Sequence, residues 1–290
     1  MFIGIDHGTT AIRFAGGGRE FKVTRQEATR FLYTDLERLG PLCDIEGIAL
    51  CYSMGDNFSS ITSVDRIRNR GVISREGAGE HIGGGTRVFD EIRKSGLPAV
   101  AIPGLHRTSP TDIRFKAYSH QASPEKIGIA FQAATDLGPE VVVSDVSSNT
   151  VTILVKEGRI YGAFDACIFA PGLEHGALDV DAIRRIDRGE CGANEAFLMA
   201  GVRYTMPPEE REPTVAMFAA MECAALLLLS PDARVALAGG LAPRIAGEVR
   251  TLLQRDIAVY DEWCASRGLE KIAKEVFSGT RSILGIDVDL

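Results

Sequence analysis

The chain has 290 residues, of which 45% are hydrophobic and 24% charged, a balance typical of a globular protein with an ample core. Its formal net charge of -7 argues against binding to the phosphate backbone of nucleic acid, because such binding requires clustered Lys and Arg. The 6 cysteines show neither a CxxC pair nor metal-ligand spacing, so we expect reduced thiols.

The sequence predicts a cytoplasmic protein without a membrane segment. The opening MFIGIDHGTT has no basic region followed by an apolar stretch, which a secretion signal would need. The most apolar stretch, residues 214–230, is interrupted by Glu222 and is too short to span a bilayer comfortably. We therefore expect a buried core helix there.

The first part of the chain predicts a mixed α/β lobe over residues 1–138. FIGID, IRFAGGG and EFKVTR read as three strands of a β-meander, the last two joined by a glycine turn. Apolar residues between positions 26 and 39 recur at helical spacing, and IEGIALCYS returns to a strand pattern.

The rest of this lobe contains one irregular segment and one clear helix. The glycine-rich residues 76–87 predict a mobile loop, because glycine raises the entropy cost of ordering. GLPAVAI predicts a strand, and residues 123–136 begin with a Ser-Pro cap signal and continue as a helix. A lobe boundary is expected at Gly138-Pro139.

The second part of the chain, residues 139–290, repeats the opening plan. EVVVSD, TVTILVK and RIYGAFDA again predict three strands, with a charged glycine turn between the last two. Helices follow near residues 193–201 and 209–230, then the strand ARVALAG, a helix over 242–254 and a C-terminal helix. This repetition of pattern indicates two copies of one fold.

Asp6-His7-Gly8-Thr9-Thr10 is the sharpest local signal for chemistry. It lies where the first strand turns into the second. A tight turn at Gly8 exposes backbone N–H groups and two hydroxyls to a phosphate. Asp6, at the end of the strand, can hold a water molecule of a hydrated Mg²⁺. An ordinary hairpin turn is the alternative.

Two further turns have a related character. Asp145 ends the first strand of the second meander and is followed by the small polar residues Ser147, Ser148, Asn149 and Thr150. Near the end of the chain, Gly239 and Gly240 join a strand to a helix, where a ligand can approach the helix N-terminus closely. A tight strand-to-helix turn is the alternative for the glycine pair.

In their order along the chain, these three turns resemble the two phosphate motifs and the adenosine motif of the acetate and sugar kinase/Hsp70/actin superfamily. More narrowly, GIDHGTTAIRF, GLHRTSPTDIRFKAYSHQASPEK and SDVSSNTVTILVKEGRIYGAFDA resemble the methanogenesis marker protein 12 family of archaea. That family is distantly similar to acetate and butyrate kinases. The resemblance covers nearly the whole chain.

The resemblance implies an α/β fold of two ribonuclease H-like lobes, as in actin-like ATPases, with ATP and Mg²⁺ in the cleft between them. It also implies roles at matching positions. The cofactor contacts are Asp6, Gly8, Thr9, Thr10, Ser147, Ser148, Asn149, Thr150, Gly239 and Gly240, and the metal residues are Asp6 and Asp145.

Catalytic candidates are Asp145 and the cationic side chains of residues 104–120. His106 and Arg107 are the leading pair there, because kinases need cations near the transferring phosphoryl group. The alternative is that these side chains are only solvated residues of a polar loop. His7 either neutralises phosphate charge, faces solvent or caps its turn. Asp56 is a candidate base or an exposed loop acid.

The leading prediction is an ATP-binding phosphotransferase of the acetate/butyrate kinase type, acting on a small metabolite in methanogenic archaea. The alternatives are an ATP-driven switch or assembly factor, and a degenerate member without catalysis. The last arises because Ser147 and Ser148 stand where the second phosphate loop usually has glycines. The expected partners are a nucleotide and a small-molecule acceptor, without nucleic acid or membrane, and a homodimer is left open.

Overall fold

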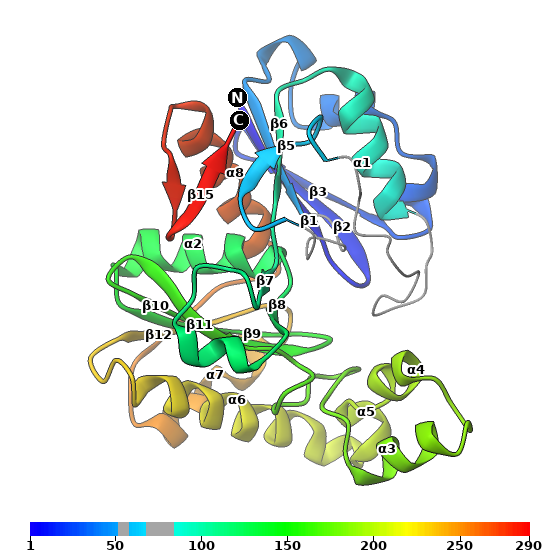
Figure 1. The fold of residues 1–290 in the computed structure, drawn as a ribbon, viewed down its shortest axis with the longest axis vertical. Helices are drawn as coiled ribbons and strands as arrows, with labels where there is room; N and C mark the ends of the chain where they lie inside the picture. Colours follow the sequence, from blue (N-terminus) through cyan, green and yellow to red (C-terminus); the bar gives the residue numbers. More distant parts are fainter. Residues whose placement is uncertain (52–57, 68–83) are drawn as a thin grey trace. The chain divides into compact units, whose positions relative to one another are not determined.

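The computed structural model describes residues 1–51, 58–67 and 84–290, which Figure 1 draws in colour. Contacts divide them into two compact units. Unit 1 holds the described residues up to 132 together with residues 263–290, and unit 2 holds residues 133–262. The predicted lobes differ from these units at the C terminus, because residues 263–290 pack with the first unit.

Unit 1 is built on a mixed sheet with the strand order β14-β15-β5-β6-β4-β1-β2-β3. Strands β1, β2 and β3 form the predicted antiparallel meander, whereas β4 is parallel to both β1 and β6. The strands are β1 (Phe2–His7), β2 (Ala11–Gly16), β3 (Arg19–Thr24), β4 (Gly47–Cys51), β5 (Ile61–Ser63), β6 (Ala99–Ile102), β14 (Ser282–Ile283) and β15 (Ile286–Asp289). A separate ladder pairs β7 (Leu105–His106) with β8 (His120–Ala122).

Helix α8 (Cys264–Phe277) packs against β1 and β4, which explains why the chain's last residues belong to unit 1. The approach is close enough to require glycine. A Cβ on Gly4 would lie 2.0 Å from the carbonyl oxygen of Ser266. Helix α2 (Glu125–Leu137) starts in unit 1 and contacts α8 through Gly128 and Gly268, where a Cβ on Gly268 would lie 1.9 Å from the carbonyl oxygen of Gly128.

The predicted helix over residues 26–39 is wrong. Two 3-10 helices, η1 (Glu27–Arg30) and η2 (Tyr33–Arg38), replace it, with extended backbone at Leu32 between them. The remaining 3-10 helices of unit 1 are η3 (Leu42–Asp44) and η5 (Ile113–Ala117).

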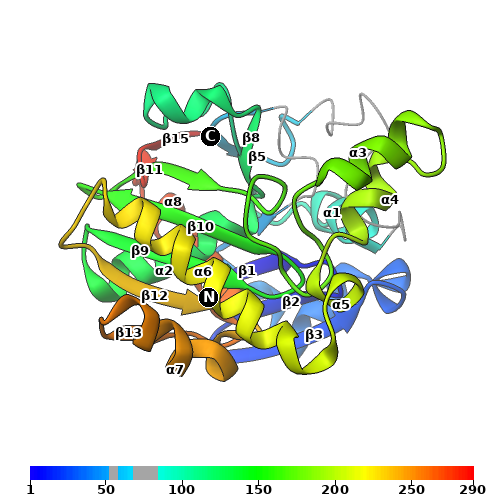
Figure 2. The ribbon, with the colours of Figure 1, turned by 90° about the horizontal axis from the view of Figure 1, so that it is seen from below.

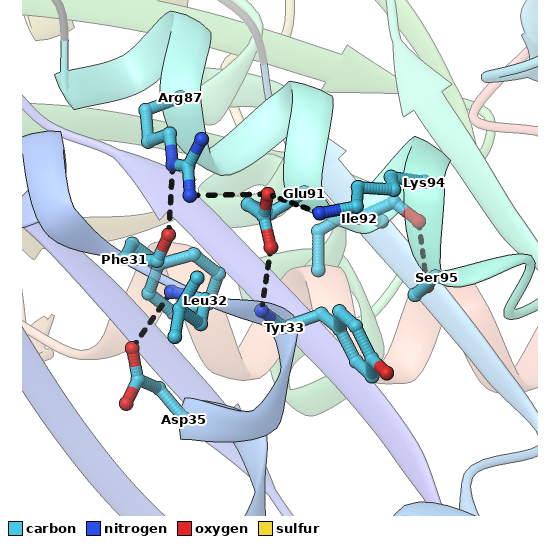
Figure 3. A network of polar contacts seen from close by, with 9 residues as sticks. All are labelled: Phe31, Leu32, Tyr33, Asp35, Arg87, Glu91, Ile92, Lys94 and Ser95. Carbon is cyan, nitrogen blue, oxygen red and sulfur yellow. Dashed lines mark hydrogen bonds and ion pairs between the residues drawn. The ribbon is translucent and has the colours of Figure 1, made fainter.

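Contacts from helix α1 (Gly84–Ser95) explain the break (Figure 3). Arg87 donates from Nε to the carbonyl of Phe31 at 3.0 Å, and the Tyr33 amide donates to Glu91 at 3.3 Å. These side chains bind backbone groups at the break that an uninterrupted α-helix would pair internally. Tertiary contacts therefore override the local helical spacing.

Helix α1 also corrects the predicted loop over residues 76–87, because the helix already begins at Gly84. Residues 76–83 and the candidate Asp56 lie outside the described residues.

Unit 2 repeats the plan of unit 1, as the sequence predicts. Its strand order β11-β10-β9-β12-β13 corresponds to β3-β2-β1-β4-β6, with the same antiparallel meander and the same parallel neighbours. The strands are β9 (Val141–Val146), β10 (Thr150–Lys156), β11 (Arg159–Phe164), β12 (Arg234–Ala238) and β13 (Ile257–Val259).

Helix α6 (Arg211–Leu227) lies across β9 and β10 in unit 2 (Figure 2). It is the buried core helix that the sequence predicts, although Met217 and Met221 on its outer side are exposed. The other helices are α3 (Val180–Asp187), α4 (Ala193–Leu198), α5 (Val202–Thr205), η6 (Pro208–Glu210) and α7 (Ala242–Leu253). Within the described parts of the chain, no helix combines the length and apolar character needed to cross a bilayer.

Candidate functional site

The first predicted turn lies at the end of β1 in unit 1. The Asp6 carboxylate is 4% exposed and lies 3.6 Å from the guanidinium of Arg13. A Cβ on Gly8 would lie 2.8 Å from both the Ala11 carbonyl oxygen and Arg13 Nη1, so the turn requires glycine. Thr9 and Thr10 are exposed. Their N–H and hydroxyl groups therefore offer donors to a ligand.

His7 follows Asp6 and packs against the start of helix α1. Arg25 donates a hydrogen bond to Nε2 of this ring, and a Cβ on Gly85 would lie only 1.6 Å from the same atom. Burial, reinforced by the charge of Arg25, lowers the pKa of His7 from 6.5 to about 3. The imidazole is therefore neutral near pH 7, which disfavours its use to neutralise phosphate charge.

A charged group at the start of α2 was missed by sequence reasoning. Lys126 is 4% exposed, and its Nζ lies 3.0 Å from the Glu125 carboxylate. Burial raises the pKa of the Cys51 thiol, and the nearby charges of Glu125 and Asp6 raise it further. These charges therefore gather around the adjoining ends of β1 and β4. The sequence signal next to Lys126 was the Ser-Pro start of the helix. It predicted a helix cap and did not indicate that Lys126 would be buried.

Unit 2 brings two of the predicted turns together. Asp145 is 6% exposed and lies on β9, directly opposite Ala238 of β12. The next residue, Gly239, has φ of +95°. A Cβ there would lie 2.3 Å from Asp145 Oδ1 and 2.7 Å from the carbonyl oxygen of Val146. Gly239 is therefore required both by its backbone conformation and by its contact with the carboxylate.

Gly240, the second glycine of this turn, has different surroundings. Among the described residues, no heavy atom outside the immediate neighbours lies within 4 Å of a Cβ built on it. Helix α7 begins two residues later, at Ala242. The backbone at Gly240 is thus open to a ligand that approaches the start of α7.

The loop after Asp145 is held from one side. Leu173 N–H donates to the Ser147 carbonyl at 3.1 Å, and the two following amides donate to Ser148 at 2.8 and 3.0 Å. The backbone N–H groups of Ser148 and Asn149 donate to no backbone acceptor within the described residues. They are therefore available to a phosphate. Thr150 is fully buried and donates its hydroxyl to the Pro171 carbonyl at 2.9 Å, which gives that hydroxyl a structural partner.

His106 and Arg107, the predicted catalytic pair, lie at the β7 ladder of unit 1. His106 is 8% exposed; its Nε2 donates to the Phe58 carbonyl at 3.1 Å and its Nδ1 lies 3.0 Å from the Thr108 hydroxyl. Arg107 is exposed and donates from Nε to the Lys116 carbonyl at 3.2 Å. Both side chains thus have structural partners. This favours the alternative that they are loop residues without a catalytic role.

The described residues contain no gathering of three His, Cys, Asp or Glu side chains that could hold a metal ion. Proteins usually bind Mg²⁺ through one or two carboxylates, while phosphates and water complete the coordination. Asp6 and Asp145 are carboxylates of the required kind.

Two solved structures with a similar fold are a kinase and a putative kinase. A ROK family glucokinase from Streptomyces griseus, solved with glucose and AMPPNP, matches 94% of this chain and 99% of its own with a TM-score of 0.50 at 13% identity. A putative 2-dehydro-3-deoxygalactonokinase from Sinorhizobium meliloti matches 96% of this chain and 100% of its own, also with a TM-score of 0.50 and 13% identity. The two-lobed sugar kinase and actin-like ATPase fold that the sequence predicts is confirmed.

Relatives in sequence come from methanogens. A UPF0285 protein of Methanosarcina mazei is 44% identical over 322 residues, covering 99% of both chains. A UPF0285 protein of Methanococcus maripaludis strain C5 is 40% identical and covers 100% of this chain and 99% of its own. No family model matches the chain. On these two relatives, which span its full length, the chain belongs to the UPF0285 family.

Proposed function

We propose that this protein binds ATP and transfers its terminal phosphoryl group to a small metabolite, in the manner of the acetate and butyrate kinases. The observation that carries the proposal is the contact in unit 2 between Gly239 and the Asp145 carboxylate. It joins the predicted adenosine turn to the predicted second phosphate loop. We also infer that the methanogenesis marker protein 12 family and the UPF0285 family are the same group.

The chemistry of these residues suits a nucleotide. The open backbone at Gly240 suits a nucleoside, and the N–H groups of Ser148 and Asn149 suit a phosphate. The glucokinase of the same fold was solved with AMPPNP, an ATP analogue, which favours the same ligand class here.

Mg²⁺ would neutralise the developing charge on the phosphates, and Asp6 and Asp145 are the residues that would hold it through oxygen or water. Asp6 forms an ion pair with Arg13, whose Nη1 lies 3.6 Å from Asp6 Oδ2. This ion pair holds the carboxylate in place at the end of β1. The turn of Gly8, Thr9 and Thr10 keeps its predicted role as a phosphate contact, with Lys126 as a further cation of unit 1.

Three glycines provide the test, because each would gain only a methyl group. We expect Gly240→Ala to fold normally and to weaken Mg-ATP binding by about tenfold in calorimetric titration, since the added Cβ enters the open space at the turn. We expect Gly239→Ala to lose both binding and local structure. Gly247→Ala is the matched control, because its Cβ also meets no atom within 4 Å but it lies inside α7.

If the wild type does not bind Mg-ATP, the proposal fails outright. Binding that is equal in Gly240→Ala and Gly247→Ala would contradict the adenosine assignment. For a protein that binds, ATP turnover should rise strongly with one member of a panel of small carboxylates. Slow turnover that no acceptor changes would instead indicate an ATP-driven switch.

A further inference from the structure

Glu222 is a buried carboxylic acid that the proposed chemistry does not use. It lies on α6 and is 1% exposed. Its Oε2 lies 2.6 Å from the Thr152 hydroxyl, and its Oε1 accepts a hydrogen bond from the Ala170 backbone N–H at 3.2 Å. Among the described residues, no Lys or Arg forms an ion pair with it.

The hydrogen bonds around Glu222 can be satisfied when the acid is protonated. Thr152 has a single hydroxyl proton but lies within hydrogen-bonding distance of both Glu222 and Ser144, the latter at 2.8 Å. If the acid donates to Thr152, the hydroxyl is free to donate to Ser144. Burial raises the pKa of Glu222 to about 8 and outweighs the hydrogen bonds from Thr152 and the Ala170 N–H, which act to lower this pKa.

Ala170 opens a short segment, residues 170–175, that lies directly on the second phosphate loop. A Cβ on Gly172 would lie 2.3 Å from Asn149 Cα, so the two backbones touch. Thr150 binds the Pro171 carbonyl at 2.9 Å, and the amides of residues 173–175 donate to the carbonyls of the loop. Glu222 therefore fixes one end of a segment whose other end holds Ser147 and Ser148.

We propose that Glu222 is a positioning residue for the second phosphate loop, acting through residues 170–175. The inference rests on the proposed function, in which this loop contacts the phosphates of ATP. Helix α6, through Glu222, then holds the loop in the conformation that binds phosphate. The side chain itself touches no substrate.

Two substitutions of similar size separate this role from simple packing. Glu222→Gln keeps an acceptor for Ala170 and a donor for Thr152, whereas Glu222→Met fills the same space and leaves the Ala170 N–H unpaired. The control is Glu212→Gln on the same helix, where the carboxylate is 35% exposed and pairs with Arg244.

The measurements are amide hydrogen exchange without nucleotide and calorimetric titration with Mg-ATP. Exchange is followed over residues 170–175 and at Ser147, the loop amide that donates to the Asn149 carbonyl at 2.9 Å. We expect Glu222→Met to speed exchange at both places by about tenfold and to weaken Mg-ATP binding by a similar factor. Glu222→Gln should restore both, and Glu212→Gln should change neither. Unchanged exchange at Ser147 in a folded Glu222→Met protein would overturn the inference.

Should Glu222→Met fail to fold, Thr152→Val removes the hydroxyl partner of Glu222 without altering α6 or residues 170–175. It should speed exchange at Ser147 as well as at residues 170–175, and unchanged exchange at Ser147 would overturn the inference. The exchange result does not depend on ATP. A wild type that binds no ATP therefore defeats the proposed function, while exchange still decides whether Glu222 holds the loop.

Discussion

Among its described residues, each unit of the protein has a glutamate buried on a helix, and the two are stabilised in opposite ways. In unit 1, Glu91 is 2% exposed and has Arg87 at 3.2 Å and Lys94 at 3.5 Å (Figure 3). In unit 2, Glu222 is 1% exposed, and its partners within the described part of the chain are a hydroxyl and an amide. Cations compensate the first charge, and protonation removes the second. Equal burial therefore leads to different chemistry, which the neighbours decide.

The largest difference is expected on truncation. Glu222→Ala should lower the free energy of unfolding by about 3 kcal/mol, because it leaves a cavity and two buried polar groups without their partner. Glu91→Ala also leaves a cavity and unpairs the Tyr33 amide, but it should cost less, about 2 kcal/mol, because Arg87 and Lys94 are 40% and 70% exposed and regain water. Urea denaturation measures both. A greater loss for Glu91→Ala would show that the comparison is wrong.

A pH titration of stability should distinguish the two acids next. Below pH 4.5 both the folded and the unfolded chain hold the Glu222 proton, whereas between pH 4.5 and about 8 only the folded chain keeps it. The Glu222 contribution is therefore full below pH 4.5 and falls by up to about 1.4 kcal/mol per pH unit through that window.

Glu222→Gln isolates this effect, because the amide does not titrate. The free energy of unfolding of the wild type, minus that of Glu222→Gln, should fall as the pH rises from 5 to about 8. His7 acts in the opposite sense, since its pKa is lowered from 6.5 to about 3 and its contribution is lost as the pH falls below 6.5. The subtraction removes the His7 term, and a difference that is flat with pH would contradict the protonated state of Glu222.

Salt should affect only the unit 1 glutamate. In about 1 M NaCl the Debye length is about 3 Å, so the partly exposed ion pairs of Glu91 are screened. The stability advantage of the wild type over Glu91→Gln should therefore shrink by about 0.5 kcal/mol. The advantage over Glu222→Gln should not change with salt, because no cation faces that acid among the described residues.

The smallest expected effect concerns a single cation of the Glu91 group. Lys94 is 70% exposed, so Lys94→Ala should change the free energy of unfolding by less than about 0.5 kcal/mol. Arg87→Ala should cost more, because Arg87 also binds the Phe31 carbonyl. If the two variants lose the same free energy of unfolding in urea denaturation, the hydrogen bond from Arg87 to Phe31 does not add to stability.

Local signals were enough to predict the two meanders. Their hairpins turn at Gly17-Gly18 and at Glu157-Gly158, and all four residues have positive φ, as tight hairpin turns require. The same repetition led to the correct fold class. Contacts between distant segments were not predictable in this way, as the short strand β15 shows by pairing with β5 across most of the chain.

The site was predictable only in part, for the same reason. Sequence reasoning found Asp145 and Gly239 separately, and the pairing of β9 with β12 brings them together. It interpreted Glu222 only as a polar interruption in an apolar stretch, because its partners, Thr152 and Ala170, are more than fifty residues away. The burial of Lys126 was missed because a helix start on its own says nothing about what packs against it.

The return of residues 263–290 to unit 1 sets the order in which the protein can be completed. The described residues of unit 2 run from 133 to 262, so all of its strands have been synthesised once residue 262 has left the ribosome. Unit 1 still lacks α8 at that moment, and the face of β1 that contains Gly4 stays uncovered until Ser266 arrives. During synthesis, the unit that begins second is therefore the first to be complete, and the N-terminal strands must remain soluble while they wait.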